Sequence, residues 1–286
     1  MTIGVNPPPA KPDTLRKRPS PLRFALPALL AVVALLAVFG AELAPQDPDA
    51  QNPALGAGPP GPGHPLGTDV LGRDVLSRLI VGTFPAVAGP VCVAIGVLVA
   101  GTLLGLLGGY HGGRIDAVIA RGADILYSMP ALLVAIVVIG TVGGGYLLTI
   151  GLLIVLTLPG TVRLIRSATL SQARLPYVDA ARAMGVRPGW ILGRHILPNI
   201  MPTVVATFLL EFTTALVSFS ALSFLGLGVA PGAADWGTML ADGQELIFEN
   251  PMMSLTPALL IVLTAVGATL VGDRLYDRAT LATEAR

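Results

Sequence analysis

The sequence predicts an all-α membrane protein with six transmembrane helices. Hydrophobic residues make up 53% of the 286 residues and charged residues only 12%, and the mean hydropathy is +0.75. A soluble domain carries about a quarter of its residues as charged side chains. The few charges also leave long uninterrupted apolar stretches, near the roughly 20 residues that a helix needs to cross a bilayer core.

The first of these stretches follows a basic segment and resembles a signal peptide in that respect. Its apolar run is too long for one, however, and Ala44-Pro45-Gln46 is a weak cleavage site. We therefore expect an N-terminal anchor helix at 24–44, preceded by a disordered tail at 1–23 that is rich in proline and has no periodicity. The other five predicted spans are 84–109, 117–140, 145–166, 199–225 and 253–272.

The segment between the first two spans, 45–83, is predicted to be an external loop that ends in a short interfacial helix. It carries four charged residues close together, Asp69, Arg73, Asp74 and Arg78. Asp74 and Arg78 are four residues apart, so we expect them to pair on one helical face.

Three features inside the spans have a physical interpretation. Gly101, Gly105 and Gly109 recur every four residues and form one smooth helical stripe, which predicts close contact with another helix. Pro159 removes a backbone donor and should kink the fourth span. Glu211 is the one carboxylate well inside a span. It is either a group of the translocation pathway that meets a cationic or amine-bearing substrate, or a protonated or hydrogen-bonded acid that faces Thr213, Thr214 or a partner helix.

The distribution of lysine and arginine predicts the orientation. With both termini in the cytoplasm, all basic residues except Arg73 and Arg78 lie on the cytoplasmic side. The loop at 226–252 has acidic residues and no basic ones. The opposite orientation would reverse this bias, so only one orientation satisfies the positive-inside rule.

Several functions are excluded or disfavoured by composition. Lys11 and Lys17, the only lysines, precede the first span, so the chain has no lysine for a phosphate-binding loop. The net charge of +1 gives no support for nucleic-acid binding, and the three histidines are too scattered to predict a metal site. The single cysteine, Cys92, is expected to be a small buried hydrophobe. An intramembrane enzyme would need a catalytic pair, and the spans offer only Glu211.

Residues 174–198 form a polar island between the fourth and fifth spans. They predict a helix, a glycine stop at Gly185 and a second helix closed by the proline of Leu197-Pro198. The island contains Arg174, Arg182, Arg187 and Arg194, which predict a cytoplasmic location. Such a compact cytoplasmic segment is suited to contact with a soluble partner.

This island resembles the "EAA" loop of bacterial ATP-binding-cassette importer permeases, with Asp179-Ala180-Ala181 in place of the usual Glu-Ala-Ala. The stretch from His64 to Asp74 resembles the second permease of dipeptide, oligopeptide and nickel importers. The same branch is also suggested by three further segments, which are Leu222 to Gly228, Asp235-Trp236-Gly237, and Gly272-Asp273-Arg274-Leu275.

The resemblance implies a type I importer permease fold, with a transmembrane domain at 84–276, a coupling loop at 167–198 and a cytoplasmic tail at 277–286. It implies a non-catalytic subunit in the bacterial inner membrane. The expected partners are a second permease, two cytoplasmic ATPases that bind ATP and Mg, and an external substrate-binding protein; the chain itself would bind no cofactor. The residues implied in coupling to the ATPases are Tyr177, Asp179, Ala180, Ala181, Ala183, Met184, Gly185, Leu197 and Pro198.

The small alanines would let the ATPase surface approach closely, and Gly185 would permit the bend. The expected substrates are dipeptides or short oligopeptides, with nickel chelates or haem as the alternative. A secondary transporter driven by ion gradients is more remote, because it would show inverted repeats and several buried ionisable groups.

Overall fold

The computed structural model describes residues 22–230 and 232–284, and these residues form helices joined by loops. Among them β-structure is limited to two isolated single-residue bridges. The long helices are α1 (Leu22–Leu43), α3 (Thr83–His111), α6 (Tyr146–Ala173), α9 (Leu197–Phe224) and α11 (Met252–Glu284). The shorter ones are α2 (Val75–Val81), α4 (Gly113–Tyr127), α5 (Ala131–Val142), α7 (Pro176–Ala183), α8 (Pro188–Trp190), the π-helical η1 (Ile191–Ile196) and α10 (Trp236–Gln244).

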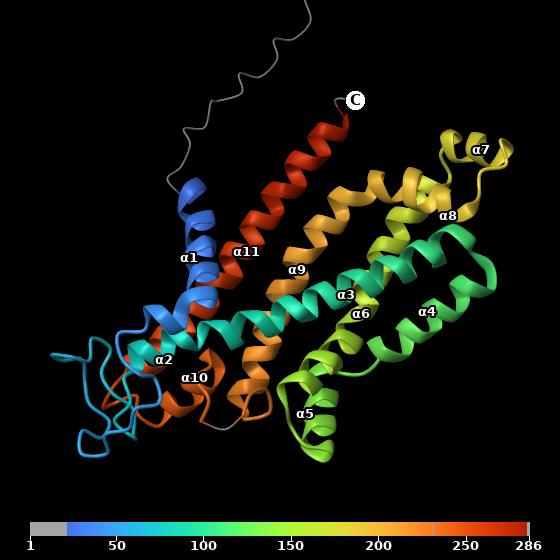
Figure 1. The fold of residues 1–286 in the computed structure, drawn as a ribbon. Helices are drawn as coiled ribbons and strands as arrows, with labels where there is room; N and C mark the ends of the chain where they lie inside the picture. The colour runs from blue at the N-terminus through green and yellow to red at the C-terminus, as the bar shows by residue number, and fades with distance from the viewer. Residues whose placement is uncertain (1–21, 231, 285–286) are drawn as a thin grey trace, which may run out of the picture.

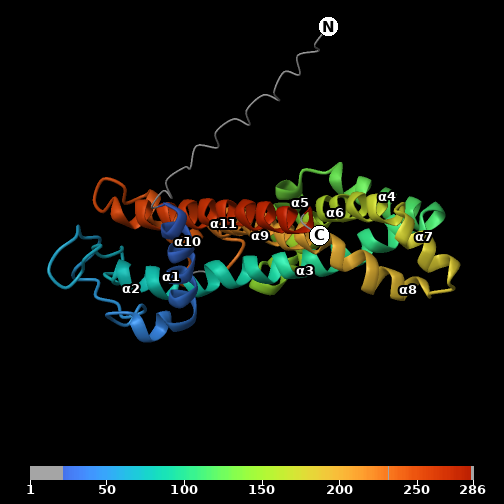
Figure 2. The same cartoon turned by 90° about the horizontal axis from the view of Figure 1, so that it is seen from above.

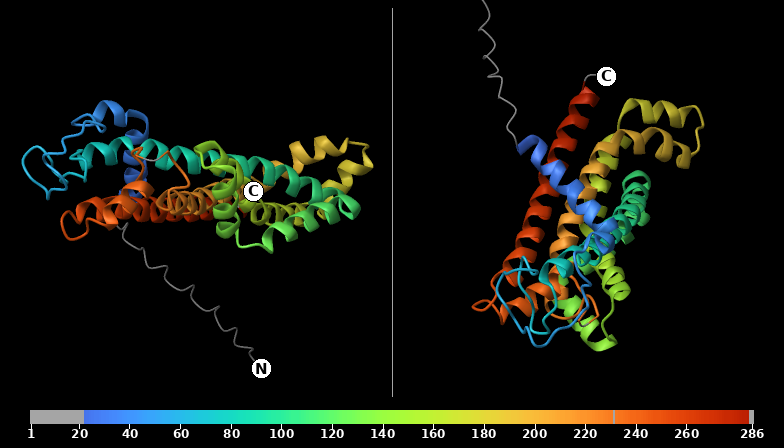
Figure 3. Two further views of the ribbon diagram at one scale, coloured as in Figure 1. Left: turned by 90° about the horizontal axis from the view of Figure 1, so that it is seen from below. Right: turned by 60° about the vertical axis from the view of Figure 1, so that its left-hand side comes forward.

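The long helices run between two ends of the molecule (Figure 1). At one end, called here the hairpin end, lie α7 and α8, the last turns of α11 and the first turns of α1. At the other, the loop end, lie residues 45–74, α2 and α10. Views from above and from other sides (Figures 2 and 3) show α7 and α8 projecting beyond the bundle. The hairpin end is the one for which the sequence predicts the cytoplasm.

Among the described residues, five helices are long and apolar enough to cross a membrane, and the number of spans rises to six if a bent pair counts as one. That pair is α4 and α5, which meet at an angle of 78°. The prediction of one continuous span at 117–140 is therefore wrong. Pro130 lacks a backbone donor and disfavours a helical conformation in the residue before it, so the helix stops at Tyr127 and a new one starts after the proline.

The centre of the bundle is the contact between α3 and α6, and it confirms the predicted glycine stripe. A Cβ atom at Gly105 would lie 2.8 Å from Cβ of Ile165 and 2.9 Å from the backbone nitrogen of Arg166. Gly101 and Gly109 face Thr161 and Thr169 of α6 in the same way. The absence of side chains along one face of α3 thus lets the two backbones approach closely.

Two arginines of α6 fasten α4 to this pair. Arg166 forms a two-pronged ion pair with Asp116, in which the Nη2–Oδ2 distance is 2.6 Å. Arg163 lies 2.5 Å from Asp124 and over the ring of Tyr127. Between these contacts and the loop end, α6 continues through Pro159 as one uninterrupted helix.

Two other expectations need correction or restriction. Cys92 is exposed on the outer face of α3 instead of buried, because neighbouring Val93 and Ala94 occupy the inward positions of that turn. The last helix, α11, continues through Glu284 into the predicted tail at 277–286. The predicted disorder of the N-terminal tail concerns residues that, up to position 21, lie outside the described part.

We predict that Gly105→Ala destabilises the protein by about 1–3 kcal/mol, because the added methyl group meets fixed backbone atoms of α6. The measurement is thermal unfolding of the purified chain in detergent. Gly151→Ala is the control, since a Cβ at Gly151 meets nothing within 4 Å. Equal midpoints for the two variants would contradict the close α3–α6 contact.

Candidate functional site

The α7 helix begins and ends as its sequence dictates. Pro176 occupies the first helical turn, where its missing N–H is not needed. At the other end Gly185 has a φ of +77°, and the amide of Val186 donates to the carbonyl of Ala181 over 3.1 Å. This pattern is a Schellman motif, which requires a left-handed residue after the helix. The glycine stop predicted at Gly185 is confirmed.

One face of α7 packs against the chain's own helices. Val178 and Ala181 are almost fully buried in a cluster with Ile165, Ile191 and Ile196. The expectation that Ala181 lets a partner approach closely is therefore wrong. Its small size serves internal packing, because it lies three residues after Val178 on the inward face.

The opposite face of α7 is open to solvent. Met184 is 76% exposed and Trp190, on α8, is 59% exposed. An exposed methionine beside small side chains is an adaptable apolar surface. The remaining exposed residues of the predicted coupling set are Asp179, Ala180, Ala183, Gly185 and Pro198.

Polar contacts fix the hairpin to the bundle. The Tyr177 hydroxyl donates to Gln172 of α6 over 2.9 Å and accepts from the Asn199 amide of α9 over 3.2 Å. Arg182 stacks over the ring of Tyr110, at the end of α3, with 4.8 Å from guanidinium to ring centre. The hairpin is thus held by three separate helices.

Leu197 and Pro198 do not close a second helix, contrary to the sequence prediction. They start α9, and residues Pro188 to Phe224 form one stretch of 37 residues. Proline lacks a donor and its ring clashes with the carbonyl four residues earlier in a regular helix. Here the residues before it, η1, are π-helical, and the wider turn accommodates the proline.

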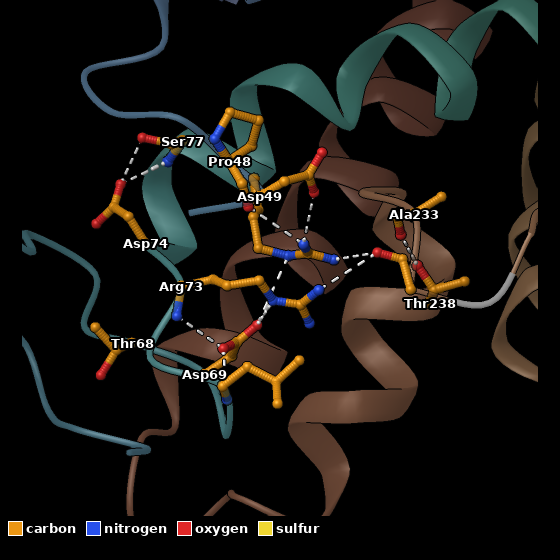
Figure 4. Close-up of polar contacts among 12 residues, drawn as sticks. Pro48, Asp49, Thr68, Asp69, Arg73, Asp74, Ser77, Ala233 and Thr238 are labelled. Carbon is orange, nitrogen blue, oxygen red and sulfur yellow. Dashed lines mark hydrogen bonds and ion pairs between the residues drawn. The ribbon is translucent and has the colours of Figure 1, made fainter. Parts of the chain in front are cut away.

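At the loop end, the predicted charged residues form a buried network (Figure 4). Arg73 Nε lies 2.6 Å from Asp69 Oδ2, and Arg78 Nε lies 3.8 Å from the same oxygen. Arg78 also donates to the carbonyls of Gly232, over 3.1 Å, and Pro48, over 3.3 Å. Asp69 and Arg78 are at most 1% exposed, so this network joins three distant segments of the chain.

The predicted pairing of Asp74 with Arg78 is wrong. Asp74 instead caps α2 by accepting from the amide of Ser77 over 2.8 Å and pairs with His64 over 2.9 Å. A capping carboxylate must point back along the helix start, and so it turns away from a side chain one turn ahead. The predicted short helix is present as α2, and its charged residue Arg78 is buried by other parts of the protein.

The Asp235-Trp236-Gly237 segment anchors the second loop. Asp235 caps α10 through the amides of Gly237 and Thr238. Burial raises the pKa of Asp235, and these amide bonds partly oppose the shift. Trp236 is fully buried, and its indole nitrogen donates to the carbonyl of Leu79 over 3.2 Å.

Glu211 lies near the middle of α9 and is half-buried. Its Oε1 accepts a hydrogen bond of 2.6 Å from the hydroxyl of Thr161, on α6. The partner is therefore a threonine of another helix, and neither Thr213 nor Thr214 of its own. In the part of the chain that the structure describes, no group of three or more His, Cys, Asp or Glu side chains is placed to hold a metal ion.

Sequence reasoning missed several residues that hold these sites. Asp116 and Asp124 of α4 pair with Arg166 and Arg163 of α6, but the aspartates are eight residues apart and the arginines three, so their spacing in the sequence does not indicate the pairing. Asn250 donates to the carbonyls of Leu66 and Thr68 across the loop end. Nothing in the local sequence around Asn250 indicates that contact.

Comparisons with known proteins agree with this architecture. Residues 101–280 match the family model described as binding-protein-dependent transport system inner membrane component. The chain is 37% identical over 76% of its length to the glutathione transport system permease protein GsiD of Pectobacterium atrosepticum, covering 72% of that protein. It is 34% identical to the probable D,D-dipeptide transport system permease protein DdpC of Escherichia coli K12, over 90% of this chain and 87% of that one.

A third relative is the dipeptide transport system permease protein DppC of Alkalihalophilus pseudofirmus, 33% identical over 97% of this chain and 94% of that one. Among solved structures, the fold is similar to inward-facing conformations of the MetNI methionine ABC transporter. The TM-score is 0.57 at 22% identity, covering 71% of this chain and 96% of that one. This structural likeness supports the fold.

We predict that Arg78→Met lowers the free energy of unfolding by about 3–5 kcal/mol, because it leaves a buried carboxylate and two carbonyls with fewer partners. Thermal unfolding and limited proteolysis of residues 45–74 provide the measurement. Arg121→Met, at an exposed position, is the control. If both variants unfold at the same temperature, the buried network does not stabilise the loop end.

Proposed function

Because the chain belongs to the family of binding-protein-dependent transport system inner membrane components, we propose that it is the permease subunit of an ATP-driven importer of dipeptides and short oligopeptides. It pairs with a second permease to form the translocation pathway. Two cytoplasmic ATPases bind ATP and Mg and contact this chain at its hairpin end. A substrate-binding protein delivers the peptide at the loop end.

One observation carries the coupling role. The α7–α8 hairpin buries Val178 and Ala181 in its own bundle and leaves Ala180, Ala183 and Met184 exposed. A segment that is rigidly attached on one face and presents small and apolar side chains beside Asp179 and Arg182 on the other is suited to transmit motion from a docked protein. The positive-inside bias favours the cytoplasmic side for this end.

The substrate class is supported by the names of the relatives. They are permeases for glutathione, a D,D-dipeptide and a dipeptide, all short peptides. Nickel chelates and haem remain the alternative substrates for the same architecture. The residues of this chain carry out no covalent step.

The mechanism is mechanical. When ATP draws the two ATPases together, the hairpin moves with them as a rigid body, because Tyr177 and the buried residues tie it to α6 and α9. α9 continues directly from η1, so the motion reaches the middle of the membrane. The cavity between the two permeases then opens alternately to each side.

Uptake by proteoliposomes that contain the complete assembly tests this function. A labelled dipeptide should accumulate only with ATP and the binding protein present. Accumulation that follows an ion gradient without ATP would instead support a secondary transporter.

We predict that Met184→Glu reduces both uptake and substrate-stimulated ATP hydrolysis at least about tenfold, since a charge in an apolar contact costs more than 1.4 kcal/mol. Folding should be unaffected, because Met184 is exposed. Co-purification of the ATPases measures docking directly. Arg187→Glu is the control. Arg187 is also exposed at this end, so this variant separates the loss of an apolar contact from a general effect of added negative charge. Equal co-purification of Met184→Glu and the unaltered chain would contradict the docking role.

At Gly185 we predict that coupling falls in the order Gly, Asn, Val. The position has a left-handed φ, which costs ordinary residues about 1–2 kcal/mol and Asn less, and no atom lies within 4 Å of an added Cβ. The ratio of peptide transported to ATP hydrolysed is the measurement. A Val variant with the unaltered ratio would show that the turn geometry is not needed.

A further inference from the structure

The pathway itself has a candidate binding group in Glu211. α9 contains no lysine or arginine, and among the described residues Glu211 forms no ion pair. Its carboxylate accepts a hydrogen bond from the Thr161 hydroxyl. One carboxylate oxygen is therefore fixed, and the other is left for a partner from outside the chain.

Thr161 is held so firmly that it sets the position of the carboxylate. It is fully buried, and its methyl group lies against Gly101 of α3, where an added Cβ would be 2.5 Å away. Three helices thus meet at this level. The carboxylate is positioned by a residue of the close contact between α3 and α6.

The open side of this site faces the groove between α6 and α9. Leu210 and Thr214, which flank Glu211 on α9, are exposed, whereas Phe212 and Ala215 are buried. On α6, Gly160 precedes Thr161 and has open space where a side chain would be. Glu211 therefore lies on the border between the packed and the open face of α9.

There is room beside this border for part of a ligand. A cavity of about 240 Å³ lies between α6, α9 and α11, and Leu164, Thr207, Leu210 and Asp273 are among its lining residues. Thr207 and Leu210 stand within one turn or so of Glu211, toward the hairpin end.

A purely structural hydrogen bond does not require a carboxylate at this place. A glutamine would accept the same bond from Thr161 without the cost of placing an ionisable group inside a membrane span. The chain carries glutamate instead, and no cation of its own in the same helix. A carboxylate with this surrounding is chemically suited to an ammonium group.

We propose that Glu211 binds the ammonium group of the transported peptide in the groove between α6 and α9. This inference rests on the proposed function, because it takes the passing substrate to be a peptide. Short peptides with a free amino terminus share one positive group whatever their side chains. The Glu211 carboxylate therefore recognises the class without selecting among sequences, and Thr161 keeps it oriented while the side chains pass.

The first test measures the charge preference of the groove without any peptide. In a Cys92→Ala background, Gly160→Cys introduces one thiol on α6 next to Thr161, the hydrogen-bond partner of Glu211, in the complete assembly. Its modification rates with 2-aminoethyl methanethiosulfonate, which carries an ammonium group, and with neutral methyl methanethiosulfonate are compared. The cationic-to-neutral ratio should fall about tenfold on Glu211→Gln, as expected for losing a nearby charge in partly desolvated surroundings. Glu245→Gln, in the loop after α10, is the control.

The second test uses the assembly with ATP and labelled Ala-Ala. Uptake should fall at least about tenfold with Glu211→Gln and recover in part with Glu211→Asp, which keeps the charge. An unchanged modification ratio, a thiol at position 160 that neither reagent reaches in any nucleotide state, or undiminished uptake by Glu211→Gln would each overturn the proposal. If the unaltered assembly takes up no peptide at all, the proposed function fails, and peptide binding at Glu211 fails with it.

Discussion

The close approach of α3 and α6 is the constraint on which the other features depend. It exists because the facing positions of α3 are glycines, and it fixes α6 as the common neighbour of the other parts. α6 receives α4 through Asp116 and Asp124, presents Thr161 to Glu211, and leads directly into α7. A bulkier α3 would displace α6 and, with it, all three contacts.

The two ends of the molecule are stabilised by different kinds of interaction. The hairpin end relies on apolar burial of Val178, Ala181 and Ile191 and leaves few charges enclosed. The loop end buries Asp69, Arg73 and Arg78, which is favourable only when the charges and their hydrogen bonds are matched. Such matching needs a defined geometry, so the loop end is held in one arrangement despite its many prolines.

Much of the fold was predictable because its causes are local. The spans follow from apolar runs, and the stop at Gly185 follows from helix-capping chemistry. The glycine stripe follows from helical spacing. The break at Pro130, the continuous helix through Pro198 and the burial of Ala181 depend on what surrounds each residue, and the sequence alone does not specify those surroundings. Asp74 could either cap α2 or form an ion pair with Arg78, and the spacing of the two residues in the sequence does not tell which interaction is more stable.

The π-helical turn at Ile191–Ile196 sets the phase of everything that follows it. Each residue advances a helix by about 100°, so the extra residue that widens this turn rotates α9 about its axis relative to a regular continuation. The direction in which the Glu211 side chain leaves α9 is therefore set some four turns away, at the π-helical turn next to the hairpin. Loss of a single residue from that turn would swing the carboxylate off the α6 side of the helix without altering one residue around it.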